Sequence, residues 1–68
     1  KIDMKKTFGT GPCAVEITKT NKNTYAVVEV GDIVKHFAGY YKAKSYEDAH
    51  LAYIREPFGQ SETEMEEE

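Results

Sequence analysis

Three stretches of the chain have the pattern of apolar and polar residues that predicts β-strands. Residues 13–19 alternate strictly between apolar and mainly polar positions, while residues 24–30 and 33–41 are rich in Val, Ile, Tyr and Phe. The polar Thr20-Asn-Lys-Asn23 separates the first two stretches, and Gly31-Asp32 is a Gly-first pair suited to a two-residue hairpin turn. The pattern therefore predicts a three-stranded antiparallel meander.

A helix is predicted after the third strand, ending at Arg55 or Glu56. Ser45 begins a Ser-x-x-acid capping pattern, and two acids fall in the first turn, where the helix dipole favours negative charge. Pro57 stops the helix because proline lacks an amide donor. One helical stripe contains Tyr46, Ala49, His50, Tyr53 and Ile54. We expect this stripe to pack on the sheet, with Phe58 folded back against the end of the core.

These elements predict a single α+β domain of β-β-β-α order, with the helix packed on one face of the sheet. We place an N-terminal arm at residues 1–12, the domain at 13–58 and a disordered acidic tail at 59–68. The arm contains two glycines and a proline within residues 9–12, which favour a loop over a strand. The net charge is −3, but the last seven residues hold five of the twelve acids, so residues 1–61 are mildly basic.

The two predicted turns fix which side chains share a sheet face, because residues opposite each other lie on the same face. The face expected under the helix contains Cys13, Val15, Ile17, Ala26, Val28, Val30, Ile33, Phe37 and Tyr41. The uncovered face is expected to present an aromatic and aliphatic patch rimmed by Glu16, Glu29 and Thr18. That patch contains Tyr25, Val27, Val34, His36 and Tyr40.

Catalysis, metal binding and cofactor binding are not predicted. Cys13, the single cysteine, lies on the covered face and His36 on the opposite one, which separates the nucleophile from its base. His50 could approach Cys13 through the core, but two ligands do not make a zinc site. No apolar run approaches the roughly 20 residues that cross a bilayer. We therefore expect a cytoplasmic, intracellular protein that is not an enzyme and does not bind membranes.

The uncovered patch predicts a protein-binding module, an adaptor or inhibitor, because tyrosines on a rigid sheet bury a large area with little loss of entropy. The edge strand at residues 13–19 also permits homodimerisation by strand pairing unless the arm covers it. A purely structural homo-oligomer subunit is a further alternative.

The order of elements resembles AP2-like domains and the N-terminal arm-binding domains of integrases, which lay a three-stranded sheet into DNA. The residues that carry this resemblance are Tyr25 to Val30, Lys35 to Tyr40, Ser45 to Ala49 and Ala52-Tyr53. The resemblance implies nucleic-acid binding, with phosphate contacts from Lys19, Lys22, Lys42 and Lys44. Unlike the AP2 sheets, this chain has no Trp, and its single Arg lies on the predicted helix.

Overall fold

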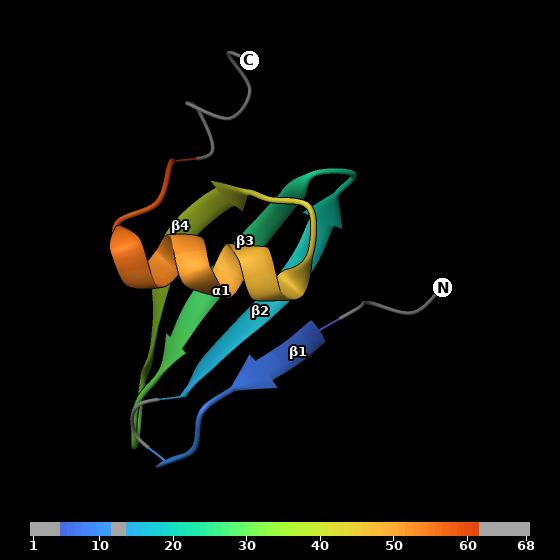
Figure 1. The fold of residues 1–68 in the computed structure, drawn as a ribbon. Helices are drawn as coiled ribbons and strands as arrows, with labels where there is room; N and C mark the ends of the chain where they lie inside the picture. The colour runs from blue at the N-terminus through green and yellow to red at the C-terminus, as the bar shows by residue number, and fades with distance from the viewer. Residues whose placement is uncertain (1–4, 12–13, 62–68) are drawn as a thin grey trace.

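The computed structural model describes residues 5–11 and 14–61, which contain four strands and one helix. These elements are β1 (Lys5–Phe8), β2 (Val15–Asn21), β3 (Thr24–Val30), β4 (Lys35–Lys42) and α1 (Tyr46–Arg55). The strands form one antiparallel sheet in the order β1-β2-β3-β4, and α1 crosses one face of it (Figure 1). The α+β class and the meander are thus confirmed. Cys13 and residues 62–68 of the predicted tail lie outside the described residues. The prediction that the tail is disordered from residue 59 is wrong at its start, because Gln60 pairs with Tyr40 of β4.

The prediction of three strands is wrong, because part of the expected arm forms β1 and pairs with β2. Lys5 lies opposite Thr18, and Phe8 lies opposite Val15. The described part of β2 is therefore not a sheet edge, and any strand addition on this side would take place at β1. No helix within the described ranges is long and apolar enough to cross a membrane.

The helix begins and ends where the sequence predicts. The Ser45 side chain accepts a hydrogen bond from the backbone amide of Asp48 at 3.1 Å, which satisfies one of the free donors at the helix start. The acidic side chains of Glu47 and Asp48 lie in the first turn and Arg55 lies in the last, so both ends complement the helix dipole. The cap and the dipole thus favour a helix of ten residues.

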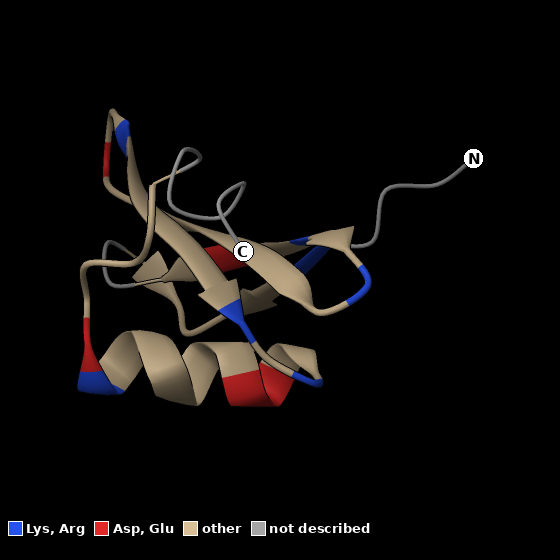
Figure 2. Ribbon diagram, turned by 90° about the horizontal axis from the view of Figure 1, so that it is seen from above, with Lys and Arg blue, Asp and Glu red and all other residues tan. Residues whose placement is uncertain are grey.

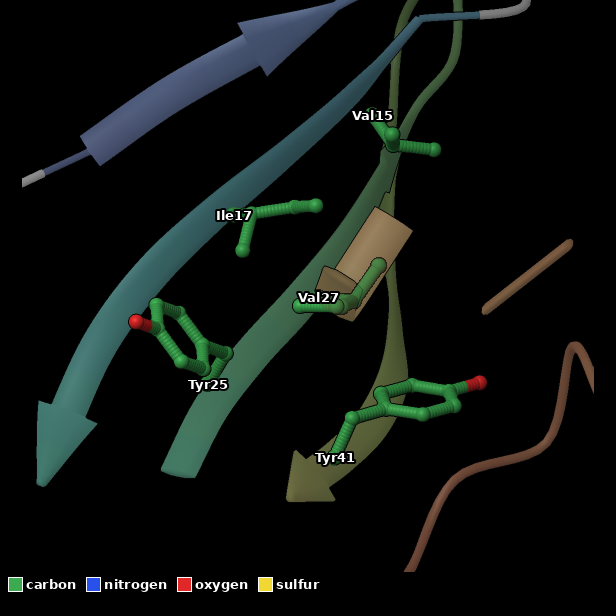
Figure 3. Close-up of a cluster of buried hydrophobic side chains, with 6 residues drawn as sticks. Val15, Ile17, Tyr25, Val27 and Tyr41 are labelled. Carbon is green, nitrogen blue, oxygen red and sulfur yellow. The ribbon is translucent and has the colours of Figure 1, made fainter. Parts of the chain in front are cut away.

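The core lies between α1 and the three longer strands. Its buried strand side chains point to the same side of the sheet (Figure 3): Val15, Ile17, Tyr25, Val27 and Tyr41. Ala49 of α1 completes this buried cluster. Two residues that were expected in or against this core lie outside it. Ile54 is 57% exposed and Phe58 is 89% exposed. The side of α1 that meets the sheet instead includes Tyr46, Ala49, Ala52 and Tyr53.

The predicted register of the first hairpin is wrong by one residue. Ile17 pairs with Val27, rather than with Ala26, because Asn21 pairs with Thr24 across a two-residue turn. Thr20 is then left as an extra residue in β2, a β-bulge that absorbs the difference. A slip of one residue exchanges the two faces of a strand, so the whole of β3 is turned over relative to the prediction.

The second hairpin also differs from its prediction. Val30 pairs with Lys35, so the loop is the four residues 31–34 rather than Gly31-Asp32 alone. Its ends are joined by a hydrogen bond from the Gly31 amide to the Val34 carbonyl at 3.0 Å. Farther along β4, Ala38 is a bulge residue between the pairs Val27–Gly39 and Val28–Phe37. This second bulge places Phe37 on the face opposite α1 while Tyr41 stays in the core.

Candidate functional site

The sheet face opposite α1 is divided into a polar half and an apolar half. Side chains alternate between the faces along a strand, and Tyr25 and Val27 point into the core, so their neighbours in β3 point away from α1. The apolar half-face, formed by β3 and β4, consists of Ala26, Val28, Val30, Phe37 and Tyr40. It is the largest group of apolar residues that this face presents, and it is our candidate site.

Phe37 is the most exposed member of the apolar half-face. Its side chain is 55% exposed, although it lies within a strand. Its ring meets the ring of Tyr40 edge to face, with the centroids 5.1 Å apart. This geometry holds the two rings in a fixed arrangement, so both can contact a partner with little further loss of entropy.

The β3–β4 loop extends the apolar surface beyond the sheet. Ile33 is 94% exposed and Val34 is 58% exposed, and we refer to these two residues as the tip. The tip follows directly from β3 and leads into β4, the two strands that carry the apolar half-face. Exposed aliphatic side chains on a short loop are a feature that a binding pocket on another protein can accept.

The polar half of this face, on β1 and β2, is organised around Glu16. Its carboxylate lies 3.7 Å from the Lys5 amine and 3.4 Å from the Lys35 amine. Glu16 is largely covered, with a side-chain exposure of 20%, whereas both lysines are more than half exposed. The carboxylate is therefore compensated, and this half of the face presents lysines to solvent.

The five residues predicted to form the partner-binding face are not brought together. Tyr25 and Val27 are 2% and 0% exposed, so their assignment to an uncovered face is wrong. Val34 belongs to the tip. His36 pairs with Glu29, which contacts α1, so His36 lies on the helix side of the sheet and is exposed there. Tyr40 alone lies on the face to which it was assigned.

The four lysines predicted as phosphate contacts all lie at one end of the sheet, and we call them the lysine end: Lys19, Lys22, Lys42 and Lys44. The pairing of Asn21 with Thr24, and of Thr24 with Lys42, places the end of β4 beside the β2–β3 turn. The Ala43 amide also donates to the Asn23 carbonyl at 3.0 Å, which ties the β4–α1 connection to that turn. Figure 2 looks onto this end of the molecule, where blue segments gather beside the red first turn of α1.

Two tyrosines at the interface of α1 and the sheet, Tyr53 of α1 and Tyr41 of β4, have their hydroxyl groups fixed by hydrogen bonds. Tyr53 donates to a Glu29 carboxylate oxygen at 2.6 Å, and this bond, with burial and the negative charge of Glu29, raises the pKa of Tyr53 to about 12. Tyr41 donates to the Glu56 carbonyl at 2.6 Å, and burial raises the pKa of its hydroxyl. Both phenols therefore stay protonated at neutral pH and act as hydrogen-bond donors.

The histidine on α1 is held by ring stacking. His50 stacks on Phe8 of β1, with centroids 4.4 Å apart and an angle of 18° between the planes. Among residues 5–11 and 14–61, no three His, Cys, Asp or Glu side chains are placed to hold a metal ion together. The contact of His50 with Phe8 therefore anchors β1 to the helix.

Sequence reasoning missed Phe37, Val28 and Val30 as site residues because the one-residue slip assigned them to the covered face. The sequence of β3 does contain a warning, because the residues on both of its faces are mainly apolar. The alternation of apolar and polar residues therefore does not decide which face of β3 the helix covers. Comparison of the chain with protein-family models, with curated proteins and with solved structures finds no match.

Proposed function

We propose that this domain is a non-enzymatic binding module whose apolar half-face and tip contact a protein partner, as an adaptor or inhibitor does. The observation that supports this most directly is Phe37, which is 55% exposed on a strand and is held edge to face by Tyr40. Large aromatic side chains in fixed positions contribute most of the affinity at many protein interfaces. The partner surface should be apolar at its centre.

The tip supports the same proposal, because it adds two exposed aliphatic residues next to the strands of the apolar half-face. Lys35 follows the tip and is bound to Glu16 at 3.4 Å, so a charged pair borders the apolar surface. An apolar centre with a charged rim is the usual anatomy of a protein interface.

The experiment compares two exposed apolar residues on opposite sides of the molecule. Phe37→Ser removes the proposed anchor, and Leu51→Ser is the matched control, since Leu51 lies on α1 and is 53% exposed. A partner captured by the wild-type chain should also be captured by Leu51→Ser and lost with Phe37→Ser. With the purified partner, Phe37→Ser should raise the dissociation constant at least about tenfold, or about 1.4 kcal/mol.

Circular dichroism should show both variants folded. If Phe37→Ser binds the partner as tightly as the wild-type chain, the apolar half-face is not the contact surface. If Leu51→Ser loses the partner instead, the outer side of α1 is the interface and the proposal is wrong.

The resemblance to AP2-like domains would place the open face of the sheet against DNA. Two lysines of that face, Lys5 and Lys35, both contact Glu16, and the half of the face formed by β3 and β4 is mainly apolar. The four lysines predicted as phosphate contacts lie at the end of the sheet instead. We therefore favour the protein contact for this face.

A further inference from the structure

We infer that the lysine end, together with Arg55, is a second binding surface, one that takes the phosphate backbone of a nucleic-acid strand. It is separate from the apolar half-face and does not depend on the proposed protein contact. Its framework is fixed by backbone bonds, since the Ala43 amide donates to the Asn23 carbonyl at 3.0 Å. Lys22 and Lys44 are the immediate neighbours of these two residues, so two cations are held on adjoining loops.

A hollow runs from the lysine end along α1 toward Arg55. It has a volume of about 370 Å³ and is lined by Lys42, Ala43, Lys44, Asp48, Leu51, Ala52 and Arg55. Lys44 precedes the helix and Arg55 ends it, so the two cations are roughly 16 Å apart at 1.5 Å per helical residue. A nucleic-acid strand carries one charge per about 3.4 Å in a duplex, so a strand along this hollow brings more than one phosphate within reach.

The charges at this surface favour an anion. Between described residues, the ion pairs use Lys5, Lys6 and Lys35. The described part of the chain therefore supplies no carboxylate partner to Lys19, Lys22, Lys44 or Arg55. Such cations can exchange their counterions for phosphates without first breaking a salt bridge.

The two carboxylates of the first helical turn do not cancel this charge. Glu47 is bound by the Lys6 amine at 3.0 Å, and that bond lowers the pKa of the Glu47 carboxyl. Asp48 lines the hollow and Glu56 directly follows Arg55, so a bound strand would meet these two carboxylates. These carboxylates are outnumbered by four cations that have no carboxylate partner among the described residues, so the surface remains positive: Lys19, Lys22, Lys44 and Arg55.

The position of the tip favours a nucleic-acid strand over a membrane surface. A protein that binds a bilayer through lysines usually inserts apolar side chains beside them. Here Leu51, 53% exposed, lines the hollow, but the most exposed aliphatic residue, Ile33, lies in the β3–β4 loop with Val34. That loop is at the end of β3 opposite the β2–β3 turn, so the tip and the lysine end cannot meet one membrane together (Figure 1).

The test measures binding of the full chain to a fluorescein-labelled oligothymidine by polarisation, over a series of salt concentrations. The site variant is Lys44→Gln with Arg55→Gln. The matched control is Lys5→Gln with Lys35→Gln, which removes the same charge from the open face of the sheet. We expect the site variant to raise the dissociation constant at least about tenfold and to reduce the salt slope by about 1.4, at 0.7 per lost phosphate contact.

The control should keep both the affinity and the salt slope of the wild-type chain. Equal losses in both variants would mean unspecific attraction to positive charge and would overturn the proposal, as would the absence of oligothymidine binding at low salt. A polyglutamate peptide that competes as well as unlabelled oligothymidine, or phosphatidylserine vesicles that bind when the oligonucleotide does not, would overturn it too. Phe37→Ser should leave oligothymidine binding unchanged, which separates this surface from the protein contact.

Discussion

Tyr41 and Tyr46 lie at the interface of α1 and the sheet, but within the described part of the chain only Tyr41 has a partner for its hydroxyl group. Tyr41 donates to the Glu56 carbonyl at 2.6 Å. The Tyr46 hydroxyl is buried and has no hydrogen-bond partner among the described residues, while its ring meets Tyr25 edge to face at 5.0 Å. A buried polar group without a partner lowers stability.

Replacement of each tyrosine by phenylalanine should therefore have opposite effects. We expect Tyr46→Phe to raise the free energy of unfolding by about 1 kcal/mol, and Tyr41→Phe to lower it by about the same amount. Urea unfolding followed by circular dichroism measures both. A destabilised Tyr46→Phe protein would mean that the Tyr46 hydroxyl group does have a hydrogen-bond partner, which would contradict this prediction.

The hydrogen bond between Tyr53 and Glu29 predicts a loss of stability at alkaline pH. A folded-state pKa of about 12, raised from 10.0, means that the unfolded chain gives up this proton first as pH rises. The stabilisation is fully present below pH 10.0 and is lost as the pH approaches about 12. Tyr53→Phe should reduce the fall in unfolding free energy over this range, and an unchanged fall would contradict the prediction.

At the scale of elements, the sequence predicts three of the four strands and the helix, but it misses β1 and the register of the strands. Residues 24–30 form β3 as expected, and Ser45 caps a helix that ends at Arg55. The register was missed because the bulges occur at Thr20 and Ala38, residue types that carry no bulge signal, and because both faces of β3 are apolar. The candidate site was missed with it, since Phe37 reaches the open face only in the observed register.

The segment after α1 returns to the free edge of β4 through a contact between two glycines. Tyr40 and Gln60 exchange backbone hydrogen bonds at 2.9 Å in both directions. Gly39 has φ of +129°, and a Cβ built there would lie 2.5 Å from the Gly59 Cα. A side chain at residue 39 would therefore strain the backbone and also displace the returning segment.

We expect Gly39→Ala to lower the free energy of unfolding by about 2 kcal/mol and to speed hydrogen exchange at the Tyr40 amide. Gly11→Ala is the control, since Gly11 also has positive φ (+63°) but a Cβ there has no neighbour within 4 Å. Gly11→Ala should lower the free energy of unfolding by about 1 kcal/mol, because an alanine there disfavours the positive φ but meets no neighbouring atom. If Gly39→Ala costs no more than Gly11→Ala, close contact with Gly59 contributes nothing to stability.

At the scale of the whole molecule, a small core carries most of the stability. A chain of this size is expected to have an unfolding free energy of about 3 to 5 kcal/mol. Ile17 is fully buried at the centre of the core, whereas Ile33, at the tip, is 94% exposed. Truncation of the isoleucine side chain should therefore lower stability at residue 17 but not at residue 33.

Ile17→Ala should cost about 4 kcal/mol and leave a large part of the chain unfolded at room temperature. Ile33→Ala should change the unfolding free energy by less than about 0.5 kcal/mol, because its side chain is already in water. Thermal unfolding and one-dimensional NMR spectra distinguish the two outcomes. A well-folded Ile17→Ala protein would mean that the core in Figure 3 is not the main source of stability.

The strand order β1-β2-β3-β4 also affects how fast the protein folds. Every strand pairs with its neighbour in the sequence, so the β2–β3 and β3–β4 hairpins can each form before distant parts of the chain meet. Only short loops must close at each step, and topologies of this kind cross a low entropic barrier. The sheet can therefore assemble rapidly. Packing of α1 on the core and of the Gly59–Gln60 segment on β4 then completes the structure.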